Sequence, residues 1–367
     1  MIAWSRVLRM GRKEMRQMLR DIRMRGVIFV APLIQLVLFG YAVSTDVREA
    51  PLIVLDLDRS VDSRALVDRL TASDYFRVVR RAERVEEIPT ALERGTALLS
   101  LEIPPGFSRD LHAGRGATMQ VLLDGTDSNT GNIALGYIQG ILRWIAQDLA
   151  VDPSGIVLEP RAWYNPSLES RVWNVPAVMG ALLLLITMLL TSLSVVRERE
   201  VGTWEQLIVS PITPTELMLG KTLPVAVIGV VDLGLVSTLA VLWFDIPFRG
   251  SVLLLLGAAV PFLVAGLSLG LLISTISRTQ QEAFMSMFLV MLPALIFSGF
   301  MFPISSMPEA FQVATLVNPL RHFLEVVRAI FLKGAGLDDL WPQLLTLVGM
   351  AALGMVVATR RFRVMMT

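Results

Sequence analysis

Long apolar runs alternate with short charged segments along most of the chain. Six runs approach or exceed the roughly 20 residues that a helix needs to cross a bilayer. They cover residues 26–43, 175–196, 222–244, 251–276, 283–302 and 340–359. This pattern predicts an α-helical membrane protein with six transmembrane helices.

The segment 44–174, between the first and second runs, has a different pattern. Short apolar, β-rich stretches alternate with helix-like stretches, and turn residues such as Asp124-Gly125 separate them. Strands that alternate with helices indicate an α/β fold. We therefore expect a small α/β domain inserted between helices 1 and 2. Its predicted elements cover residues 52–57, 63–70, 76–79, 86–94, 97–103, 105–112, 119–123 and 133–149.

Two further segments are amphipathic. Residues 1–25 place basic side chains on one face and an apolar set on another, namely Trp4, Val7, Leu8, Met15, Met18, Leu19 and Ile22. This is typical of a helix lying in the membrane interface, although a solvated basic tail is the alternative. Residues 303–339 carry short amphipathic stretches on either side of Asn318-Pro319. They predict amphipathic or re-entrant helices at the outer membrane face, where irregular backbone must be covered by protein or water.

Composition supports the membrane interpretation. The chain is 54% hydrophobic with a mean hydropathy of +0.61, and only 18% of its residues are charged, whereas soluble domains carry roughly a quarter. A net charge of +1 argues against a nucleic-acid partner. The absence of cysteine excludes disulfides and thiolate chemistry. We expect the first run to be an uncleaved span, since no small-residue cleavage site follows it.

The distribution of basic residues predicts the orientation. Arginine and lysine are concentrated in residues 1–25, and arginines follow the last run at 360, 361 and 363. Because positive residues flank the cytoplasmic ends of membrane helices, both termini and the 197–221 loop are expected in the cytoplasm. The 44–174 domain is then extracytoplasmic.

Apparent enzyme motifs do not withstand inspection. Leu219-Gly220-Lys221-Thr222 ends like a P-loop, but Thr215 stands where that motif requires its first glycine. Gly220 is better interpreted as a helix break and Lys221 as an anchor at the inner membrane face. Residues 266–270 match the serine-hydrolase elbow, yet they lie inside an apolar run and suit helix packing instead.

We predict no cofactor and no metal site. The chain has two histidines, and a structural metal site usually takes more His or Cys ligands. A cation could be surrounded by Asp56, Asp58, Asp124 and Asp127, but aspartates in such positions are more often turn residues.

Two polar residues inside predicted spans are candidates for a translocation path. Asp232 lies near the middle of the third run, and an ionisable residue there is costly and by default a functional candidate. A structural hydrogen bond or a neutral, protonated carboxyl group is the alternative. Gln35 in the first run is a weaker case of the same kind.

The most informative motif is the charged loop after the second run, Arg197-Glu198-Arg199-Glu200-Val201-Gly202-Thr203-Trp204-Glu205-Gln206-Leu207. Together with Ser210-Pro211-Ile212, residues 246–251, residues 298–304 and Asn318-Pro319-Leu320-Arg321, it makes the whole chain resemble the permease subunit of type-2 ABC exporters. The resemblance is to the branch associated with drug efflux. One departure is Arg321-His322, where relatives often place an aromatic residue soon after the proline.

The resemblance implies that the loop is a coupling helix that docks on an ATPase subunit. Carried onto this sequence, the docking and transmission residues are Glu198, Glu200, Gly202, Thr203 and Glu205. It further implies a permease without an ATP site of its own, which exports amphipathic drugs or lipid-like substrates. The implied partners are a cytosolic ABC ATPase, a second permease, membrane lipids and a periplasmic adaptor, and the implied location is the bacterial inner membrane.

Other function classes remain open alternatives. A polysaccharide or lipid-carrier exporter permease generally lacks an outer domain of this size. A non-transporting scaffold or sensor would be expected to carry a cytosolic signalling module, and the chain ends soon after the last run. A membrane enzyme is disfavoured by the failed motifs.

Overall fold

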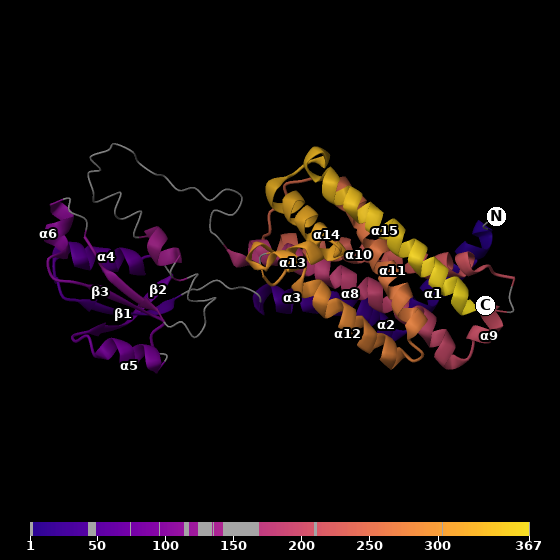
Figure 1. Ribbon diagram of the computed structural model, residues 1–367, viewed down its shortest axis with the longest axis horizontal. Coiled ribbons are helices and arrows are strands. Elements are labelled where there is room, and N and C mark those ends of the chain that lie inside the picture. Colours follow the sequence, from indigo (N-terminus) through magenta and orange to yellow (C-terminus); the bar gives the residue numbers. More distant parts are fainter. Residues whose placement is uncertain are drawn as a thin grey trace. The chain divides into compact units, whose positions relative to one another are not determined.

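The computed structural model describes residues 3–42, 49–73, 75–94, 96–113, 117–123, 134, 136–141, 169–208, 211–302 and 304–366. The chain divides into two compact units, which are described separately. The helical unit comprises residues 1–44 and 162–367, and the sheet unit comprises residues 45–161 (Figure 1).

The helical unit consists of long helices joined by short turns. Its elements are α1 (Trp4–Arg20), α2 (Ile22–Arg25), η1 (Gly26–Val30), α3 (Ala31–Ala42), α8 (Ser170–Val201), α9 (Trp204–Ile208), α10 (Pro214–Phe244), α11 (Val252–Ile276), α12 (Gln280–Ile296), η2 (Ile304–Ser306), α13 (Glu309–Thr315), α14 (Pro319–Arg328), η3 (Ala329–Lys333) and α15 (Leu337–Met366). Both chain termini lie at the same end of this unit, which we call the terminal end (Figure 1).

Five helical segments are long and apolar enough to cross a membrane: Ile22–Tyr41, Ser170–Val201, Pro214–Phe244, Val252–Ile276 and Leu337–Met365. They correspond to five of the six predicted spans, which confirms the mainly helical membrane-type architecture. The predicted span at 283–302 corresponds to α12, which is apolar but has only 17 residues. It ends earlier than expected because the chain turns at Gly299, whose φ of +78° suits glycine. The sixth span therefore stays a prediction.

Helix α8 forms the centre of the helical unit. Most of its apolar stretch is buried, and it packs against α3, α10, α11, α12 and α14. Gly270 allows a close approach of α11 to α8, since a Cβ atom there would lie 2.8 Å from the Met188 carbonyl oxygen. Gly266 faces Leu184 and Thr187 in the same interface. Residues 266–270 are thus a helix-packing surface, as expected, and not a nucleophile elbow.

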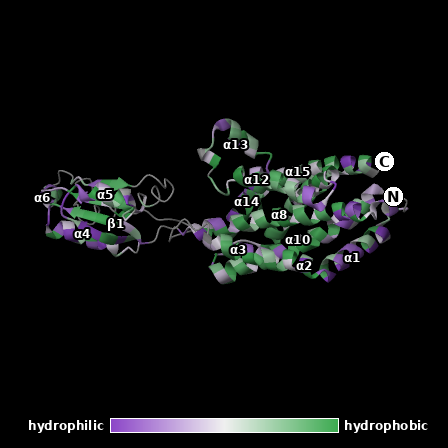
Figure 2. Ribbon diagram, turned by 90° about the horizontal axis from the view of Figure 1, so that it is seen from below, coloured by the Kyte–Doolittle hydropathy of each residue, from purple (hydrophilic) through white to green (hydrophobic). Residues whose placement is uncertain are grey.

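The outward surface of the helical unit is largely apolar (Figure 2). Exposed large apolar side chains follow α10, α12 and α15, and they include Val227, Val231, Leu235, Phe284, Leu289, Leu345 and Leu353. So much exposed apolar surface suits lipid tails or another apolar helix rather than water.

Helix α14 and its continuation η3 are buried in the bundle. Phe323 stacks on Phe262 of α11 with ring centroids 4.0 Å apart, and Gly180 of α8 gives room to Leu324. At the end of α14, Arg328 donates to the Trp173 carbonyl and lies 3.9 Å over the Trp173 ring. The amphipathic pattern of this segment thus reflects a face buried against helices within the described chain.

The sheet unit contains four strands in the order β2-β1-β3-β4. Its elements are β1 (Ala50–Asp56), α4 (Val61–Thr71), β2 (Phe76–Ala82), α5 (Glu87–Glu93), β3 (Leu99–Ile103), α6 (Phe107–His112) and β4 (Gln120–Leu123). Strands β2, β1 and β3 are parallel, and β4 is antiparallel to β3. The expected α/β pattern is confirmed, while most of the predicted helix 133–149 lies outside the described residues.

Alternate residues of β1 face opposite layers of the sheet unit. Leu52 and Val54 pack against α4, whereas Ile53 and Leu55 pack against Ile88 of α5 (Figure 1). The aspartates considered as cation ligands have other roles where they are described. Asp58 accepts hydrogen bonds from the backbone of residues 106 and 108, and Asp56 accepts from Ser63. Asp124 and Asp127 lie outside the described residues.

Candidate functional site

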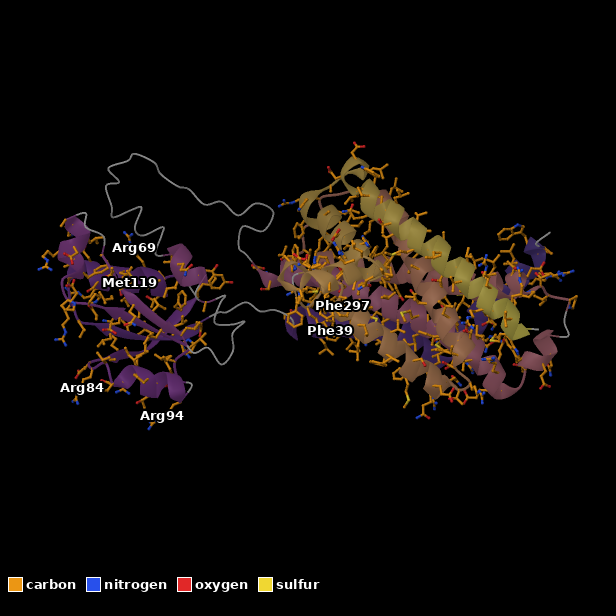
Figure 3. The ribbon with its side chains drawn as sticks, viewed as in Figure 1. Phe39, Arg69, Arg84, Arg94, Met119 and Phe297 are labelled. Carbon is orange, nitrogen blue, oxygen red and sulfur yellow. The ribbon has the colours of Figure 1, made fainter. Side chains whose placement is uncertain are left out.

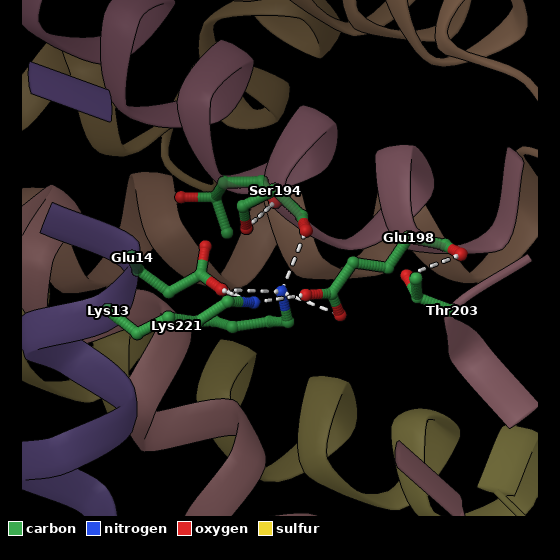
Figure 4. A network of polar contacts seen from close by, with 7 residues as sticks. Lys13, Glu14, Ser194, Glu198, Thr203 and Lys221 are labelled. Atoms are coloured by element: carbon green, nitrogen blue, oxygen red, sulfur yellow. Dashed lines mark hydrogen bonds and ion pairs between the residues drawn. The ribbon is translucent and has the colours of Figure 1, made fainter. Parts of the chain in front are cut away.

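Four charged side chains form a compact network at the terminal end, which we call the Lys221 cluster: Lys13, Glu14, Glu198 and Lys221 (Figure 4). The Lys221 ammonium is fully buried and lies 3.0 Å from Glu198 and 3.3 Å from Glu14. It also donates to the Ser194 carbonyl at 2.8 Å. Lys13 completes the cluster, 2.9 Å from Glu198 and 3.1 Å from Glu14.

The cluster joins three helices that are far apart in sequence. Glu14 and Lys13 come from α1, Glu198 from the last turn of α8, and Lys221 from α10. The two positive and two negative charges balance, which a buried group of charges requires. Burial lowers the pKa of Lys13, but its hydrogen bond to Glu198 and the charges of both carboxylates raise it overall. The cluster therefore holds α1, α8 and α10 as one body.

The cluster corrects two interpretations of the sequence. Lys221 is not an interfacial anchor, because its side chain is enclosed by protein. Gly220 does not break a helix, because α10 runs through it. A Cβ atom on Gly220 would lie 2.8 Å from Met10 of α1, so the glycine allows α1 and α10 to approach closely. Helices α1 and α10 are therefore joined at the same place by an ion pair, Lys221 with Glu14, and by close backbone packing at Gly220.

Helix α1 has two apolar faces rather than one. Its buried face carries Val7, Met10, Gly11, Glu14 and Met18 against the rest of the helical unit. Trp4 and Leu8 of α1 and Ile22 at the start of α2, which the sequence assigned to the same face as Val7, are exposed. The exposed apolar set remains available for the membrane interface, while the buried set attaches the helix to α10.

The first turn of α10 is attached to the start of α1. Thr213 caps α10 and forms a reciprocal capping box with Glu216. The same Glu216 carboxylate accepts a hydrogen bond from the Ala3 backbone at 2.7 Å, and Arg6 lies 3.6 Å from it. Arg6 also donates to the Pro211 carbonyl. These contacts hold residues 211–213 and the first turn of α10 against the start of α1.

The end of α8 is shaped by two of the predicted coupling residues. Gly202 ends the helix with a φ of +81°, a left-handed conformation that favours glycine. The Thr203 hydroxyl then donates to the Glu198 carbonyl at 3.3 Å. Both residues therefore set the direction in which the chain leaves the Lys221 cluster.

The same helix end contacts the turn between α11 and α12. Arg199 donates to the carbonyl oxygens of Ser274 and Ser277, at 3.3 and 3.1 Å. Glu200 accepts hydrogen bonds from the Gln280 backbone and from its side-chain amide, the latter at 2.7 Å. Movement of the α8 end would therefore act on α11 and α12 as well.

Helix α9 presents a polar surface outward. Trp204 is buried, packs edge-on against Phe362 of α15 and lies 5.7 Å from the Arg199 guanidinium. On the opposite side, Glu205 and Gln206 are exposed. Among the described residues Glu205 has no hydrogen-bond or ion-pair partner, unlike Glu198 and Glu200. Of the five predicted coupling residues, it is therefore the side chain free to meet another molecule.

The predicted path residues are not brought together. Asp232 lies in the middle of α10, is 1% exposed, and neither of its carboxylate oxygens has a partner among the described residues. Gln35 is half-buried in α3, and no hydrogen bond joins it to Asp232. The buried Asp232 carboxyl group therefore forms no hydrogen bond with any of the described residues.

Sequence reasoning missed Lys13 and Glu14. A usable signal was present, because Glu14 falls three and four positions from Gly11, Met10 and Met18 on the buried stripe of α1. An acidic residue on the packed face of an otherwise basic helix requires a buried cation as a partner. Lys221, one of few lysines in the chain, is that cation.

Comparisons with known proteins show the family of the chain. The model of the ABC-2 family transporter proteins matches residues 24–360. The chain is 35% identical over 344 residues to the probable multidrug ABC transporter permease YbhR of Escherichia coli, covering 93% of this chain and 94% of that protein. It is 33% identical to the probable multidrug ABC transporter permease YbhS, covering 91% and 90%, and 32% identical to the inner membrane transport permease YhhJ, covering 97% and 96%, both also of E. coli.

Proposed function

The chain belongs to the ABC-2 family as a membrane permease, and we propose that it forms the translocation path of an exporter powered by a separate ATPase subunit. The proposed substrates are amphipathic drugs or lipid-like molecules. The names of its relatives, which include multidrug transport permeases, support this substrate class.

The observation that carries the proposal is the arrangement at the end of α8. Glu205 is exposed and unpartnered among the described residues, whereas a few residues away Glu198 is locked to α1 and α10 through the Lys221 cluster. A partner that pushes on α9 would therefore move α8, α1 and α10 together. Buried, paired charges resist deformation, so they can transmit such a displacement.

The proposed orientation places the terminal end in the cytoplasm. The basic residues of α1 and those of the last turns of α15 lie at this end of the helical unit, together with α9 (Figure 1). Positive residues favour the cytoplasmic side. We accordingly assign six spans, with α12 as the fifth, and an extracytoplasmic sheet unit, in a bacterial inner membrane.

A second permease and lipids complete the proposed assembly. The exposed apolar faces of α10, α12 and α15 suit contact with a second permease, identical or related, and with lipid. We assign Asp232, and with less direct support Gln35, to the path between the permeases, because a buried unpartnered carboxyl group suits a site that meets a substrate or a facing subunit.

The docking step can be tested with one charge reversal. Glu205→Arg should weaken binding of the cognate ATPase subunit to the permease in nanodiscs by at least about tenfold, since opposed charges set interface specificity. The matched control is Glu309→Arg, an exposed glutamate on α13. Equal binding by the wild type and Glu205→Arg, or equal weakening by both variants, would contradict the assignment of α9 as the docking helix.

A further inference from the structure

A groove of about 500 Å³ lies on the helical unit, between α12 and α15 and over the last turns of α11. Helix α15 packs extensively on α11, whereas α12 packs chiefly on α8, so the two flanking helices leave part of α11 uncovered between them (Figure 1). Ile276 of α11 and Val364 of α15, which both line the groove, are 72% exposed. The groove is therefore open to the surroundings of the bundle.

One end of the groove lies at the terminal end of the helical unit. Helices α11 and α15 both run toward that end, and Gly354 of α15 lies directly against Ser268 of α11. Arg361 and Thr275, each seven residues further along its helix, both line the groove. Seven helical residues span about 10 Å, so Arg361 lies about that much closer to the terminal end than the contact at Gly354.

The other end of the groove is apolar. Leu269 and Leu272 of α11 and Val290 of α12 line it. Helix α12 begins beside the end of α8 and leads toward Phe297, which lies away from the two termini (Figure 3). Val290 therefore lies further from the terminal end than Arg361. The groove thus has a cationic end and an apolar end, arranged along the direction of the helices.

The cationic end of the groove is not neutralised within the described chain. Among the described residues that line the groove, Arg361 is the only charged one, and it is exposed without a hydrogen-bond or ion-pair partner. Two carboxylates contact the nearby turn between α11 and α12, but both have other partners. Glu200 accepts from the Gln280 amide, and Glu282 accepts from the Arg278 backbone. The groove therefore favours a ligand that is anionic at one end and apolar at the other.

We propose that this groove binds one anionic phospholipid, with its headgroup phosphate on Arg361 and an acyl chain along Leu269, Leu272 and Val290. Basic pockets between membrane helices suit anionic headgroups, and apolar side chains suit the acyl chain. A helix of a second permease is a poor occupant, because it would bury the Arg361 charge, which is costly without a paired carboxylate. The assignment of this lipid to the cytoplasmic leaflet rests on the proposed function, but the binding itself does not.

The test uses the full chain in detergent and two lipids with the same chains, dioleoyl phosphatidylglycerol and dioleoyl phosphatidylcholine, which differ in net charge. Native mass spectrometry measures how many lipids the protein retains and how tightly. The wild type should retain one phosphatidylglycerol about fivefold more tightly than phosphatidylcholine, the effect of one arginine at an anionic surface. A phosphatidylglycerol with a photoreactive group in its acyl chain should label residues 269–276.

Two pairs of variants separate charge from shape. Arg361→Gln should abolish the preference for phosphatidylglycerol. Arg360→Gln should keep it, because that exposed arginine points about 100° away around the helix and does not line the groove. Ile276→Trp should fill the groove and weaken retention of both lipids about fivefold or more. Leu353→Trp, at an exposed position of α15 outside the groove, should not. Thermal unfolding checks that each variant remains folded.

Four outcomes would overturn the proposal. Equal retention of the two lipids by the wild type would remove the preference for an anionic headgroup. Equal loss of preference in Arg360→Gln and Arg361→Gln would indicate a diffuse attraction to the basic helix end. Photolabelling only outside residues 269–276 would place the lipid elsewhere.

The fourth outcome concerns a second permease as the occupant. The chain has no cysteine, so Ile276→Cys introduces a single thiol at the groove. Rapid oxidative cross-linking of this variant to a second copy in nanodiscs would show that a permease covers the groove in place of lipid. None of the four outcomes bears on ATPase binding in Glu205→Arg, so failure here is distinguishable from failure of the proposed function.

Discussion

Two of the buried charged residues of helix α10, Lys221 and Asp232, have opposite surroundings. Lys221, near its start, is enclosed by two carboxylates and a carbonyl oxygen. Asp232, in the middle of the same helix, is equally buried but has no polar partner among the described residues.

The difference separates structural charge from functional charge. A buried charge whose partners come from the same chain stabilises one arrangement of that chain. A buried charge without such partners reduces stability, so its presence favours a role with a partner from outside. We therefore interpret the Lys221 cluster as a mechanical joint, that is, a set of contacts that makes α1, α8 and α10 move together. We interpret Asp232 as a residue that takes part in transport.

Removing Lys221 should have the largest effect on stability. Lys221→Met leaves Glu14 and Glu198 buried with Lys13 alone, and breaking a buried ion pair costs about 3–5 kcal/mol. We expect a sharply lower thermal unfolding temperature and folded yield in detergent. Lys333→Met is the control, since that lysine is exposed on η3. Similar behaviour of the two variants would show that the cluster does not hold the terminal end together.

Filling the contact between α1 and α10 should have a smaller effect. Gly220→Leu forces atoms into the position of Met10, and overpacking costs about 1–3 kcal/mol. Met10→Ala should recover part of this loss in the double variant, because it frees the space that the new side chain needs. If the effects of the two substitutions on the thermal unfolding temperature were simply additive, the loss caused by Gly220→Leu would not arise from a clash with Met10.

Substitutions of Asp232 should affect transport more than stability, in contrast to those of Lys221 and Gly220. Asp232→Asn keeps the shape, so we expect a change in stability below about 1 kcal/mol together with reduced transport. Asp232→Leu removes an unpartnered polar group and should be at least as stable as the wild type. Unchanged transport in Asp232→Asn would remove this residue from the path.

The smallest expected effect is a dependence on alkaline pH. The pKa of Lys13 in the folded protein lies above its ordinary value near 10.5. The stability it contributes is therefore fully present below that value and is lost as pH rises through the raised pKa. The unfolding temperature of the wild type should fall more than that of Lys13→Met as the pH rises from about 10 to about 12, with Lys333→Met behaving like the wild type. Parallel curves for wild type and Lys13→Met would contradict the pairing.

The sequence predicted the long helices and the strands of the sheet unit because both follow from local patterns. Apolar runs predicted six spans, five of which correspond to long apolar helices of the structure, and short β-rich stretches predicted β1 to β4. It could not predict the Lys221 cluster, since the partners come from α1, α8 and α10 and only packing brings them together. The motif that placed Glu198, Glu200, Gly202, Thr203 and Glu205 in one group could not show that Glu198 is enclosed while Glu205 is free. Gly220 was misinterpreted for the same reason, because the need for a glycine arises from Met10 on another helix.

The most direct test of the mechanical joint is the number of ATP molecules hydrolysed per substrate exported in proteoliposomes that contain the permease and its ATPase subunit. Glu198→Gln keeps the geometry of the cluster but removes the charge that binds Lys13 and Lys221. The account predicts that this ratio rises by about fivefold or more, as expected for the loss of a coupling energy of about 1 kcal/mol, while ATPase binding is retained. A ratio equal to that of the wild type, with export and hydrolysis changed in proportion, would contradict it.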